Sequence, residues 1–459
     1  MAPTAENPTA GSPAARQILR TYVTLTLLST FASSMIWGIN TLFLLDAGLS
    51  VAGAFAVNAF FTVGMVAFEV PTGVVADARG RRASYLLGAA TLFVSTLLYL
   101  LMWQTSAPLA AWAGASVLLG LGFTFFSGAT EAWLVDGLRA TGYTGTLESA
   151  FARGQVATGI AMLTGTIAGG LLAQFTNLGV PYVVRAALLG LTFVVAWRSM
   201  HDVGFVPQRS ASVVREMRGI VRSSLDHGLL NPPVRWLMLA APFSAGVGIY
   251  GFYAAQPYLL ELYGDSEAYA VAALSAALVA GAQIVGGLLV PQVARLFRRR
   301  TSVLLAGTAL TAGVLVLLGL ASTFWLAVVL LALWSTAFAV MGPVRQAFLN
   351  GLIPSAQRAT VLSSDNLLSS AGGAVAQPAL GKVADVWSYG TSYVVSAGVQ
   401  LLALPFVALA RREQASSDPT GDVPSEPYAE ELPTGAAPVE DVLVGAGAGD
   451  QTVATCSMR

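Results

Sequence analysis

One short charged loop, placed between two long apolar stretches, reads Gly73-Val74-Val75-Ala76-Asp77-Ala78-Arg79-Gly80-Arg81-Arg82. An acid at the end of one helix, a glycine that permits a tight turn and a following pair of arginines favour a charge-assisted clamp between neighbouring helix ends. No charged residue occurs at positions 47–68 before the loop or at positions 83–130 after it. Because a membrane-spanning helix needs about 20 predominantly apolar residues, the loop is predicted to join two membrane spans.

The composition excludes a soluble enzyme. Of the 459 residues, 55% are apolar and 10% are charged, and the mean hydropathy is +0.68, whereas soluble domains carry roughly 25% charged residues. The sequence contains no Gly-x4-Gly-Lys-Ser/Thr loop and Lys382 is its only lysine, so ATP-driven pumping by this chain is excluded too. We therefore expect neither enzymatic activity nor a cofactor. With only His201, His227 and Cys456 as soft ligands, we also expect no metal site.

The gaps between charges predict an all-α integral membrane protein with twelve membrane-spanning helices. Six predicted spans precede the polar stretch 201–232, at 21–45, 47–68, the two parts of 83–130 divided at 104–108, 148–175 and 182–198. Six more follow it, at 236–260, 268–294, the two parts of 301–344 divided near 322–323, 359–381 and 387–410. Two equal sets of six helices are the sign of a chain built as two six-helix bundles.

These boundaries divide the chain into five segments. They are a disordered N-terminus (1–16), an N-terminal six-helix bundle (17–200), a cytoplasmic linker (201–232), a C-terminal six-helix bundle (233–412) and an acidic, disordered C-terminal tail (413–459). The tail holds nine acids and one arginine and has too few apolar residues to fold. In the linker, the apolar spacing predicts an amphipathic helix on the inner membrane surface, serving either as a half-packed linker or as a lipid sensor.

The distribution of arginine predicts the orientation of the helices. If the N-terminus is inside, the inner loops and the flanking helix ends hold Arg79, Arg81, Arg82, Arg139, Arg198, Arg209, Arg215, Arg218, Arg222, Arg295, Arg298, Arg299, Arg300 and Arg358. This agrees with the positive-inside rule. The first 15 residues lack the apolar core of a signal peptide. We therefore expect a multi-pass protein of the cell membrane with both termini in the cytoplasm.

The loop at 73–82 resembles the signature loop between the second and third helices of the major facilitator superfamily. The two sets of six helices extend the resemblance over residues 17–412. The resemblance implies two six-helix bundles with the substrate path between them. It also implies a cytoplasmic gate motif made of Gly73, Asp77, Arg79, Gly80, Arg81 and Arg82. The alternative is a loop that only sets the orientation. The second half repeats the basic loop at 295–300, but Arg295 stands where Asp77 would be, so a degenerate second clamp is predicted.

The fifth predicted span contains Gly165-Thr166-Ile167-Ala168-Gly169-Gly170. This segment is similar to the Gly-Pro-x-x-Gly-Gly motif of proton-coupled antiporters in the same superfamily, with Thr166 in place of the proline. The resemblance favours export, as do segments 68–73 and 128–133, which resemble stretches of bacterial exporters of drugs and small molecules. Alternatively, the small residues simply allow the span to pack closely against a neighbour.

Ionisable side chains inside the membrane are the strongest candidates for function, because each is costly there unless it is paired or hydrated. Glu69, Glu131 and Arg153 are predicted to share one polar site in which a carboxylate carries a proton, or else to form a static salt-bridge network. Polar and aromatic candidates for a substrate cavity are Asn40, Asn58, Tyr250, Tyr253, Gln256 and Gln283. We interpret the remaining membrane charges as gate or interface pairs, namely Asp46, Arg185, Arg345, Lys382 and Asp385.

The leading hypothesis is a secondary active transporter that works by alternating access and exports an amphipathic small organic molecule in exchange for protons. The alternative is a proton-coupled uptake symporter, and a receptor or scaffold without transport is a third possibility. A mainly aromatic and aliphatic cavity would favour the first hypothesis, whereas a fixed arginine or lysine for an anionic substrate would favour the uptake symporter. The small number of positive charges at mid-depth favours the first. Besides the substrate, protons and the lipid bilayer, we expect no partner: the protein is predicted to be a monomer that binds no nucleic acid.

Overall fold

The computed structural model describes residues 12–126, 129–145, 147–205, 228–353 and 355–420. The N-terminal half contains α1 (Pro13–Ser34), α2 (Asn40–Asp46), α3 (Val51–Arg79), α4 (Arg81–Thr105), α5 (Leu109–Thr124), α6 (Ala129–Ala140), α7 (Leu147–Phe175) and α8 (Val180–Ser199). The C-terminal half contains α10 (Pro232–Tyr263), α11 (Tyr269–Leu296), α12 (Arg300–Gly319), α13 (Phe324–Asn350), α14 (Ser355–Val386), α15 (Tyr389–Leu401) and α16 (Ala403–Arg412). The amphipathic helix predicted in the linker lies outside the described residues.

Ten helical stretches of the described chain are long and apolar enough to cross a membrane. They are α3, α4, α5 with α6, α7, α8, α10, α11, α12, α13 and α15 with α16. These correspond to ten of the twelve spans expected from the sequence. The other two, α1 and α14, lie against several neighbours, and α14 buries Asp365 and Gln377 among α3, α10 and α15. A helix that packs against several others can carry polar groups on its buried faces. The buried polar groups of α14 lower the mean hydropathy of that helix.

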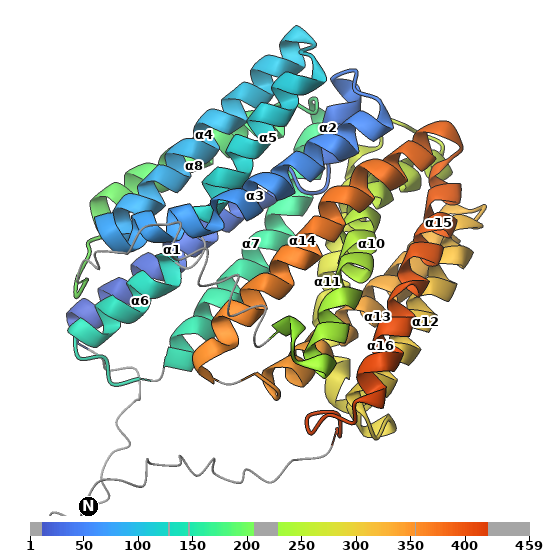
Figure 1. Ribbon diagram of the computed structural model, residues 1–459. Coiled ribbons are helices and arrows are strands. Elements are labelled where there is room, and N and C mark those ends of the chain that lie inside the picture. Colours follow the sequence, from blue (N-terminus) through green and yellow to red (C-terminus); the bar gives the residue numbers. More distant parts are fainter. Residues whose placement is uncertain (1–11, 127–128, 146, 206–227, 354, 421–459) are drawn as a thin grey trace, which may run out of the picture. The chain divides into compact units, whose positions relative to one another are not determined.

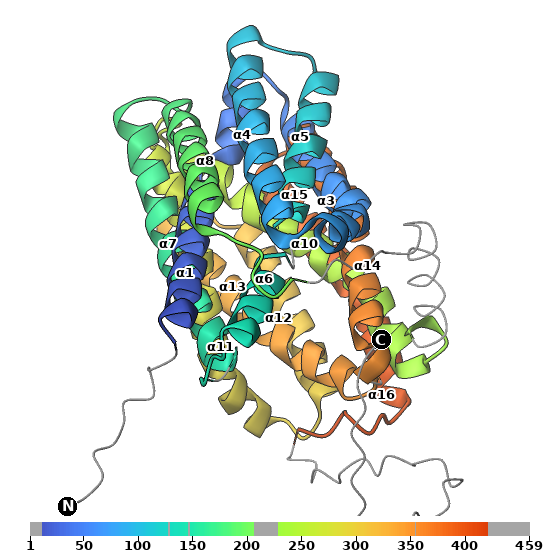
Figure 2. The same cartoon turned by 90° about the vertical axis from the view of Figure 1, so that its left-hand side faces the viewer.

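The two halves repeat the same helix pairings. In the N-terminal half α3 packs against α5, and α4 against α8; in the C-terminal half α11 packs against α13, and α12 against α15 (Figure 1). Likewise α1 lies beside α7 (Figure 2), as α10 lies beside α14. The halves contact each other through α3 with α14 and α7 with α11. We call the helix ends that carry Asp46 the Asp46 end, and the opposite ends the Asp77 end.

The repeat extends to the capping of one helix in each half. Asp202, which follows α8, accepts a hydrogen bond from the backbone N–H of Arg82 in the first turn of α4 (2.9 Å). Asp418, which follows α16, accepts from the backbone N–H of Thr301 in the first turn of α12 (2.8 Å) and from the Thr301 hydroxyl (3.0 Å). A carboxylate at a helix N-terminus satisfies free N–H groups and complements the helix dipole. Asp418 is therefore the counterpart of Asp202, whereas Arg295 stands at the position that corresponds to Asp77.

At two places the structure differs from the expected segment boundaries. The N-terminal half begins at Ser12 rather than at position 17: the Ser12 hydroxyl caps α1 by accepting from Ala15 N (3.1 Å) and donates to Thr141 O (2.9 Å). At the other end, residues 413–420 pack on the C-terminal half instead of belonging to the tail. Ser417 and Asp418 are buried there, and the Ser417 hydroxyl donates to the carbonyl of Phe348 (2.8 Å).

The first predicted span is not one continuous helix. α1 ends at Ser34, a turn follows, and α2 begins at Asn40. Inside this break, Gly38 lies so close to α11 that an added Cβ would come within 2.7 Å of the Ala273 Cα. The break therefore brings the backbone of the N-terminal half into direct contact with the C-terminal half, which a regular helix with side chains would prevent.

The Asp418 cap predicts where the chain can be shortened. We expect Asp418→Ala to reduce the free energy of unfolding by about 1–2 kcal/mol, the usual cost of losing an N-cap. Truncation after Arg412 should lower the apparent melting temperature for the same reason, whereas truncation after Thr420 should not. The melting temperatures of these three variants can be measured by intrinsic fluorescence during heating of the purified proteins. Equal melting temperatures for the two truncations would contradict the role of Asp418 as a stabilising cap of α12.

Candidate functional site

The loop at 73–82 forms a clamp within the N-terminal half. Asp77 Oδ1 lies 2.5 Å from Arg81 Nη1, and Arg81 Nε lies 3.9 Å from Asp136 Oδ2 on α6. The guanidinium of Arg81 also lies over the ring of Phe205, 5.7 Å from its centroid. These contacts connect the Asp77 ends of α3, α4 and α6, so the motif stabilises one half of the molecule as a unit.

The remaining residues of this motif differ in role. Gly80 has a φ of +104°, and a Cβ there would overlap the carboxylate of Asp202, so only glycine suits this turn. Arg82 Nη2 donates to the carbonyl of Trp197 on α8 (2.7 Å). Gly73 and Arg79 are exposed. The structure thus assembles Asp77, Gly80, Arg81 and Arg82 into one network and places the other two outside it.

At the Asp46 end, Gln256 of α10 fills the break between α1 and α2. Its Nε2 donates to the carbonyl of Trp37 (2.7 Å), and its Oε1 accepts from the backbone N–H of Thr41 (3.1 Å). The Thr41 hydroxyl donates to the carbonyl of Tyr253 (3.2 Å). Gln256 is 0% exposed. One side chain of the C-terminal half therefore satisfies two backbone groups that the break in the N-terminal half leaves without helical partners.

Further hydrogen bonds join the halves near the same end. Val51 N donates to Asp385 Oδ1 (3.1 Å), and Ala270 N donates to Gln174 Oε1 (3.2 Å). Lys382 Nζ lies 3.9 Å from Asp385 Oδ2, so the expected pair forms and lies at the interface. In the described part of the chain, the hydrogen bonds between the halves run from the Asp46 end only as far as the middle of α3 and α14. The described interface is therefore closed at the Asp46 end.

A cavity of about 340 Å³ lies next to the Gln256 contacts. Its lining comes from both halves and consists of Ile36, Trp37, Asn40, Asn58, Phe61, Met65, Tyr99, Leu119, Phe123, Met162, Arg185, Phe252 and Tyr253. We call it the central cavity. Asn40 Nδ2 donates to Asn58 Oδ1 (2.9 Å), and the Tyr182 hydroxyl donates to Asn40 Oδ1 (2.9 Å). Of the six cavity candidates from the sequence, Asn40, Asn58 and Tyr253 are brought together here.

The other three candidates lie elsewhere. Tyr250 of α10 is buried between the halves: its hydroxyl donates to Ser392 Oγ of α15 (2.5 Å), and its ring lies 4.8 Å from that of Phe55 on α3. Gln256 belongs to the contact that closes the Asp46 end, and Gln283 is exposed on α11. Neither Tyr250 nor Gln283 lines the central cavity.

Arg185 is a cavity residue that the sequence analysis assigned to a gate or interface pair. It is 1% exposed on α8, and its Nε and Nη2 have no hydrogen-bond partner in the described part of the chain. No acid stands three or four positions away from it in the sequence. That absence was the available signal, because an arginine inside a span without an acid in helical reach needs a partner from outside its helix.

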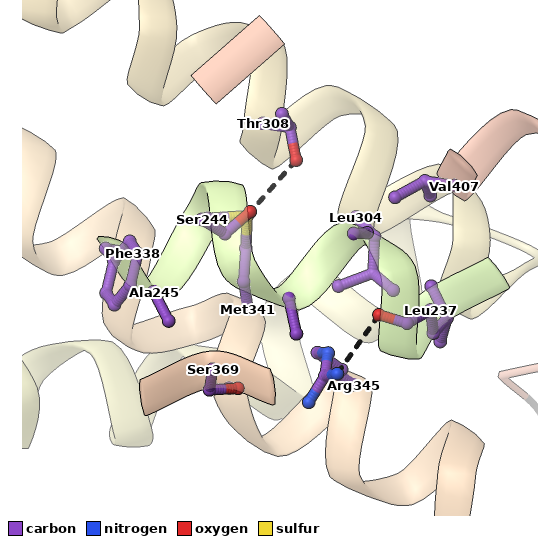
Figure 3. A pocket seen from close by; sticks show the side chains of 13 residues that line it. Leu237, Ser244, Ala245, Leu304, Thr308, Phe338, Met341, Arg345, Ser369 and Val407 are labelled. Carbon is purple, nitrogen blue, oxygen red and sulfur yellow. Dashed lines mark hydrogen bonds between the residues drawn. The ribbon is translucent and has the colours of Figure 1, made fainter. Parts of the chain in front are cut away.

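A second cavity, of about 180 Å³, lies inside the C-terminal half among α10, α12, α13, α14 and α16 (Figure 3). Arg345 reaches it and donates to the carbonyl of Leu237 (3.1 Å). Its guanidinium also forms two bonds with the buried carboxylate of Asp365, Nη1 to Oδ2 at 2.6 Å and Nη2 to Oδ1 at 2.5 Å. This ion pair joins α13 to α14 within the C-terminal half and does not cross between the halves.

The three candidates for proton coupling do not form ion pairs with one another among the described residues. Glu69 and Glu131 are exposed on α3 and α6. α6, which carries Glu131, contacts α1, and Tyr22 of α1 packs directly on Gly154 of α7. Arg153, which precedes Gly154, lines an open pocket of about 430 Å³ together with Arg16, Arg20 and Tyr143.

The glycines of α7 are explained by close packing. A Cβ at Gly165 would overlap the hydroxyl of Ser34, and one at Gly169 would overlap the carbonyl of Met35, both at the end of α1. A Cβ at Gly170 would overlap Ala273 of α11 in the other half. The packing explanation considered for this segment therefore accounts for all three glycines.

Comparison with known proteins agrees with this architecture. Residues 22–297 and 282–440 match the family model of the Major Facilitator Superfamily. The nucleoside transporter NupG has 13% identity, a TM-score of 0.71 and a match covering 85% of this chain and 98% of its own. The POT family transporter PepTSo has 15% identity and a TM-score of 0.66, with coverage of 87% and 98%.

A bacterial homolog of the human lysosomal transporter Spinster, in an inward-facing and occupied conformation, also has 15% identity and a TM-score of 0.66, covering 88% of this chain and 98% of its own. No curated protein matches the sequence. At these identities the solved structures show the fold alone, whereas the family model covers most of the chain. The chain is a transporter that belongs to the major facilitator superfamily.

Proposed function

We propose that this protein is a secondary active transporter that carries a small organic molecule through the central cavity by alternating access. The observation that carries this proposal is the position of the cavity. Both halves line it, and the hydrogen bonds of Gln256 to Trp37 and Thr41 close the interface beside it. A site at the interface of two repeated bundles becomes accessible from either side when the bundles rock against each other.

We further propose that the Asp77 end faces the cytoplasm of a cell-membrane protein. The arginines of the 73–82 loop and of the 295–300 loop support this orientation through the positive-inside rule. In that orientation the closed Asp46 end faces outward, as it does in an inward-facing state of an alternating-access transporter. Adding α1 and α14 to the ten apolar stretches gives twelve spanning helices. Two bundles of six such helices fit this orientation.

The rocking motion needs two rigid halves and an interface that opens. The clamp of Asp77, Arg81 and Asp136 supports the first requirement, because all its bonds lie within the N-terminal half. The contact of Gln256 supports the second, because water can replace a side-chain amide at Trp37 O and Thr41 N once the halves separate. The clamp is therefore proposed to move as a whole rather than to break at each cycle.

For coupling to protons, we propose the group around Tyr22. α6, which carries Glu131, contacts α1, and Tyr22 of α1 packs on α7 beside Arg153. Protonation of Glu131 would remove a negative charge from the junction of α1, α6 and α7. Glu69 on α3, which also lies toward the Asp77 end, is the second candidate for the carboxylate that carries the proton. A change of charge at a junction of helices biases their arrangement.

Export and uptake both fit this cavity, and counterflow in proteoliposomes distinguishes them from a receptor without transport. Loading the vesicles with a candidate solute and following the exchange of labelled solute tests for transport itself. Imposing a pH gradient of either sign then shows whether protons drive the solute in the opposite direction, as in an exporter, or in the same direction, as in an uptake symporter. A complete absence of exchange across a broad set of solutes would favour the receptor.

Gln256→Leu is expected to shift the protein away from the conformation described here. The change leaves Trp37 O and Thr41 N without partners when the Asp46 end is closed, but not when that end is open to water. In a protein whose Cys456 is replaced by serine, a single cysteine introduced near Asp46 should react faster with a membrane-impermeant maleimide in the Gln256→Leu background.

The control is Gln104→Leu, which makes the same substitution at an exposed position of α4 near the same end. Its labelling rate should equal that of the parent. Equal rates in the Gln256→Leu and Gln104→Leu proteins would show that Gln256 does not hold the Asp46 end closed.

Glu131→Gln and Glu69→Gln test the proposed coupling. If one of these carboxylates carries the proton, its amide should preserve downhill exchange but remove accumulation driven by a pH gradient, because the amide cannot change charge. If the acid is only a structural brace, the amide should lower the melting temperature and leave the pH dependence of transport intact. Gradient-driven transport that survives in both variants, measured in the same proteoliposomes, eliminates these acids as the coupling site.

A further inference from the structure

We propose that the central cavity selects an organic acid, a small molecule with one carboxylate on an aromatic or otherwise apolar body, and that Arg185 binds the carboxylate. This inference rests on the proposed transport function and specifies the substrate class for the same site. It starts from a charge that the described structure leaves unpaired. Arg185 is 1% exposed, lines the cavity and has no ion-pair partner in the described part of the chain.

The surroundings of Arg185 offer no counter-charge among the described residues. The titratable groups that act on it electrostatically are the phenols of Tyr182 and Tyr99, which are neutral at physiological pH. None of the thirteen residues that line the cavity is an acid. A buried arginine without a partner is costly in a membrane protein, so an anion from outside the chain is the partner that makes this position reasonable.

Arg345 shows what a structural arginine looks like in the same fold. Its guanidinium is bonded on two nitrogens by Asp365 and donates to the carbonyl of Leu237 as well. Each arginine lies beside a cavity among packed helices. Arg345 is 22% exposed and is bonded by its own chain, whereas Arg185 is 1% exposed and has no ion-pair partner in the described part of the chain. The difference indicates that Arg185 is kept for a ligand rather than for packing.

The polar atoms of the central cavity that lack a hydrogen-bond partner in the described part of the chain are all donors. Besides Nε and Nη2 of Arg185, the Nδ2 of Asn58 is buried and has no hydrogen-bond partner among the residues described. All three atoms are hydrogen-bond donors. A ligand that satisfies them must supply acceptors, as a carboxylate does with its two oxygens. A cationic or donor-rich substrate would leave them unsatisfied and would meet the positive charge of Arg185.

The rest of the lining defines the body of the ligand. Trp37, Phe61, Phe123 and Phe252 present aromatic rings, and Met65 and Met162 add flexible apolar surface. The volume of about 340 Å³ is near the lower end of the roughly 300–1,000 Å³ of ligand pockets. The site therefore fits a single aromatic ring with an acid group better than a bulky polycyclic compound. Such a molecule remains amphipathic, as the sequence analysis expected of the substrate.

The first test needs no knowledge of the ligand. Removing an unpaired buried charge should stabilise the empty protein, whereas removing one partner of a buried ion pair should destabilise it. We expect Arg185→Met to raise the apparent melting temperature of the purified, ligand-free protein and Arg345→Met to lower it. Arg198→Met, at an exposed position of the same helix α8, is the control and should change little. A lower melting temperature for Arg185→Met would show that Arg185 is a structural residue and would overturn the proposal.

The second test measures binding by thermal shift and calorimetry in detergent, without a membrane gradient. The probes are benzoate, phenylacetate and salicylate, the neutral analogue benzamide, and sulfate as an inorganic anion. We expect at least one aromatic carboxylate to stabilise the parent and the Arg198→Met protein, and benzamide not to. Binding should weaken by roughly 30-fold or more in Arg185→Met, the usual loss when a buried charge pair loses one member.

The possible outcomes separate this inference from the proposed function. Equal effects of benzamide and benzoate, equal binding in Arg185→Met, or no effect of any carboxylate would each refute an acid site at Arg185. Stabilisation by sulfate as strong as by the carboxylates would replace the organic acid with an inorganic anion. Carboxylate binding that requires Arg185, together with no counterflow of the same acid, would refute transport but keep the site. Counterflow of a panel compound that is unchanged in Arg185→Met would keep transport and refute the site.

Discussion

A polar backbone group inside a membrane bundle has no water to bond with, so it must find a partner within the protein. The turn between α1 and α2 creates such groups, and Gln256 of the opposite half satisfies Trp37 O and Thr41 N together. The packing around this contact agrees with that requirement. Gly38 and Gly170 let the N-terminal half approach Ala273 of the C-terminal half closely enough for the Gln256 amide to reach the turn. The broken helix and the contact between the halves are thus one feature. The break is stable because the interface is closed, and the interface closes because the break offers it bonds.

The sequence predicted most helices well and their interruptions poorly. The polar, proline-containing segment 104–108 located the turn between α4 and α5, and the charges at Glu148 and Arg198 located the start of α7 and the end of α8, because a span must be apolar and a loop need not be. The break at 35–39 carries no charge and no proline, and the side chain that bonds to it, Gln256, stands over 200 positions later. The packing of residues 413–420 was missed for a similar reason: their composition is that of a tail, and the helix end that they cap is far away in the sequence.

The site was predicted in part. Asn40, Asn58 and Tyr253 were selected as polar groups at mid-depth, and the fold brings them to one cavity. For charged groups, the residue type alone did not distinguish a structural ion pair from a side chain without a partner in the described part of the chain. Arg185 and Arg345 both stand inside spans, and only the positions of their described neighbours show that one is bonded by Asp365 while the other is not. Pairing is a property of two helices at once, so a pattern along one helix could not reveal it. Glu69, Glu131 and Arg153 illustrate the same point, because closeness in depth did not make them an ion-paired cluster in the described structure.

The two helix caps have a consequence for biosynthesis. Asp202 is 120 residues downstream of Arg82, and Asp418 is 117 residues downstream of Thr301. At a synthesis rate of roughly 5–20 residues per second, each capped helix waits about 6–24 s for its acid to be made. During that interval the N-terminus of α4, and later that of α12, has to be satisfied by water or lipid headgroups. Each half is therefore completed only when its last helix has been followed by a few more residues. The same delay occurs twice during the synthesis of one chain, because the repeat has kept the acid at the end of each half.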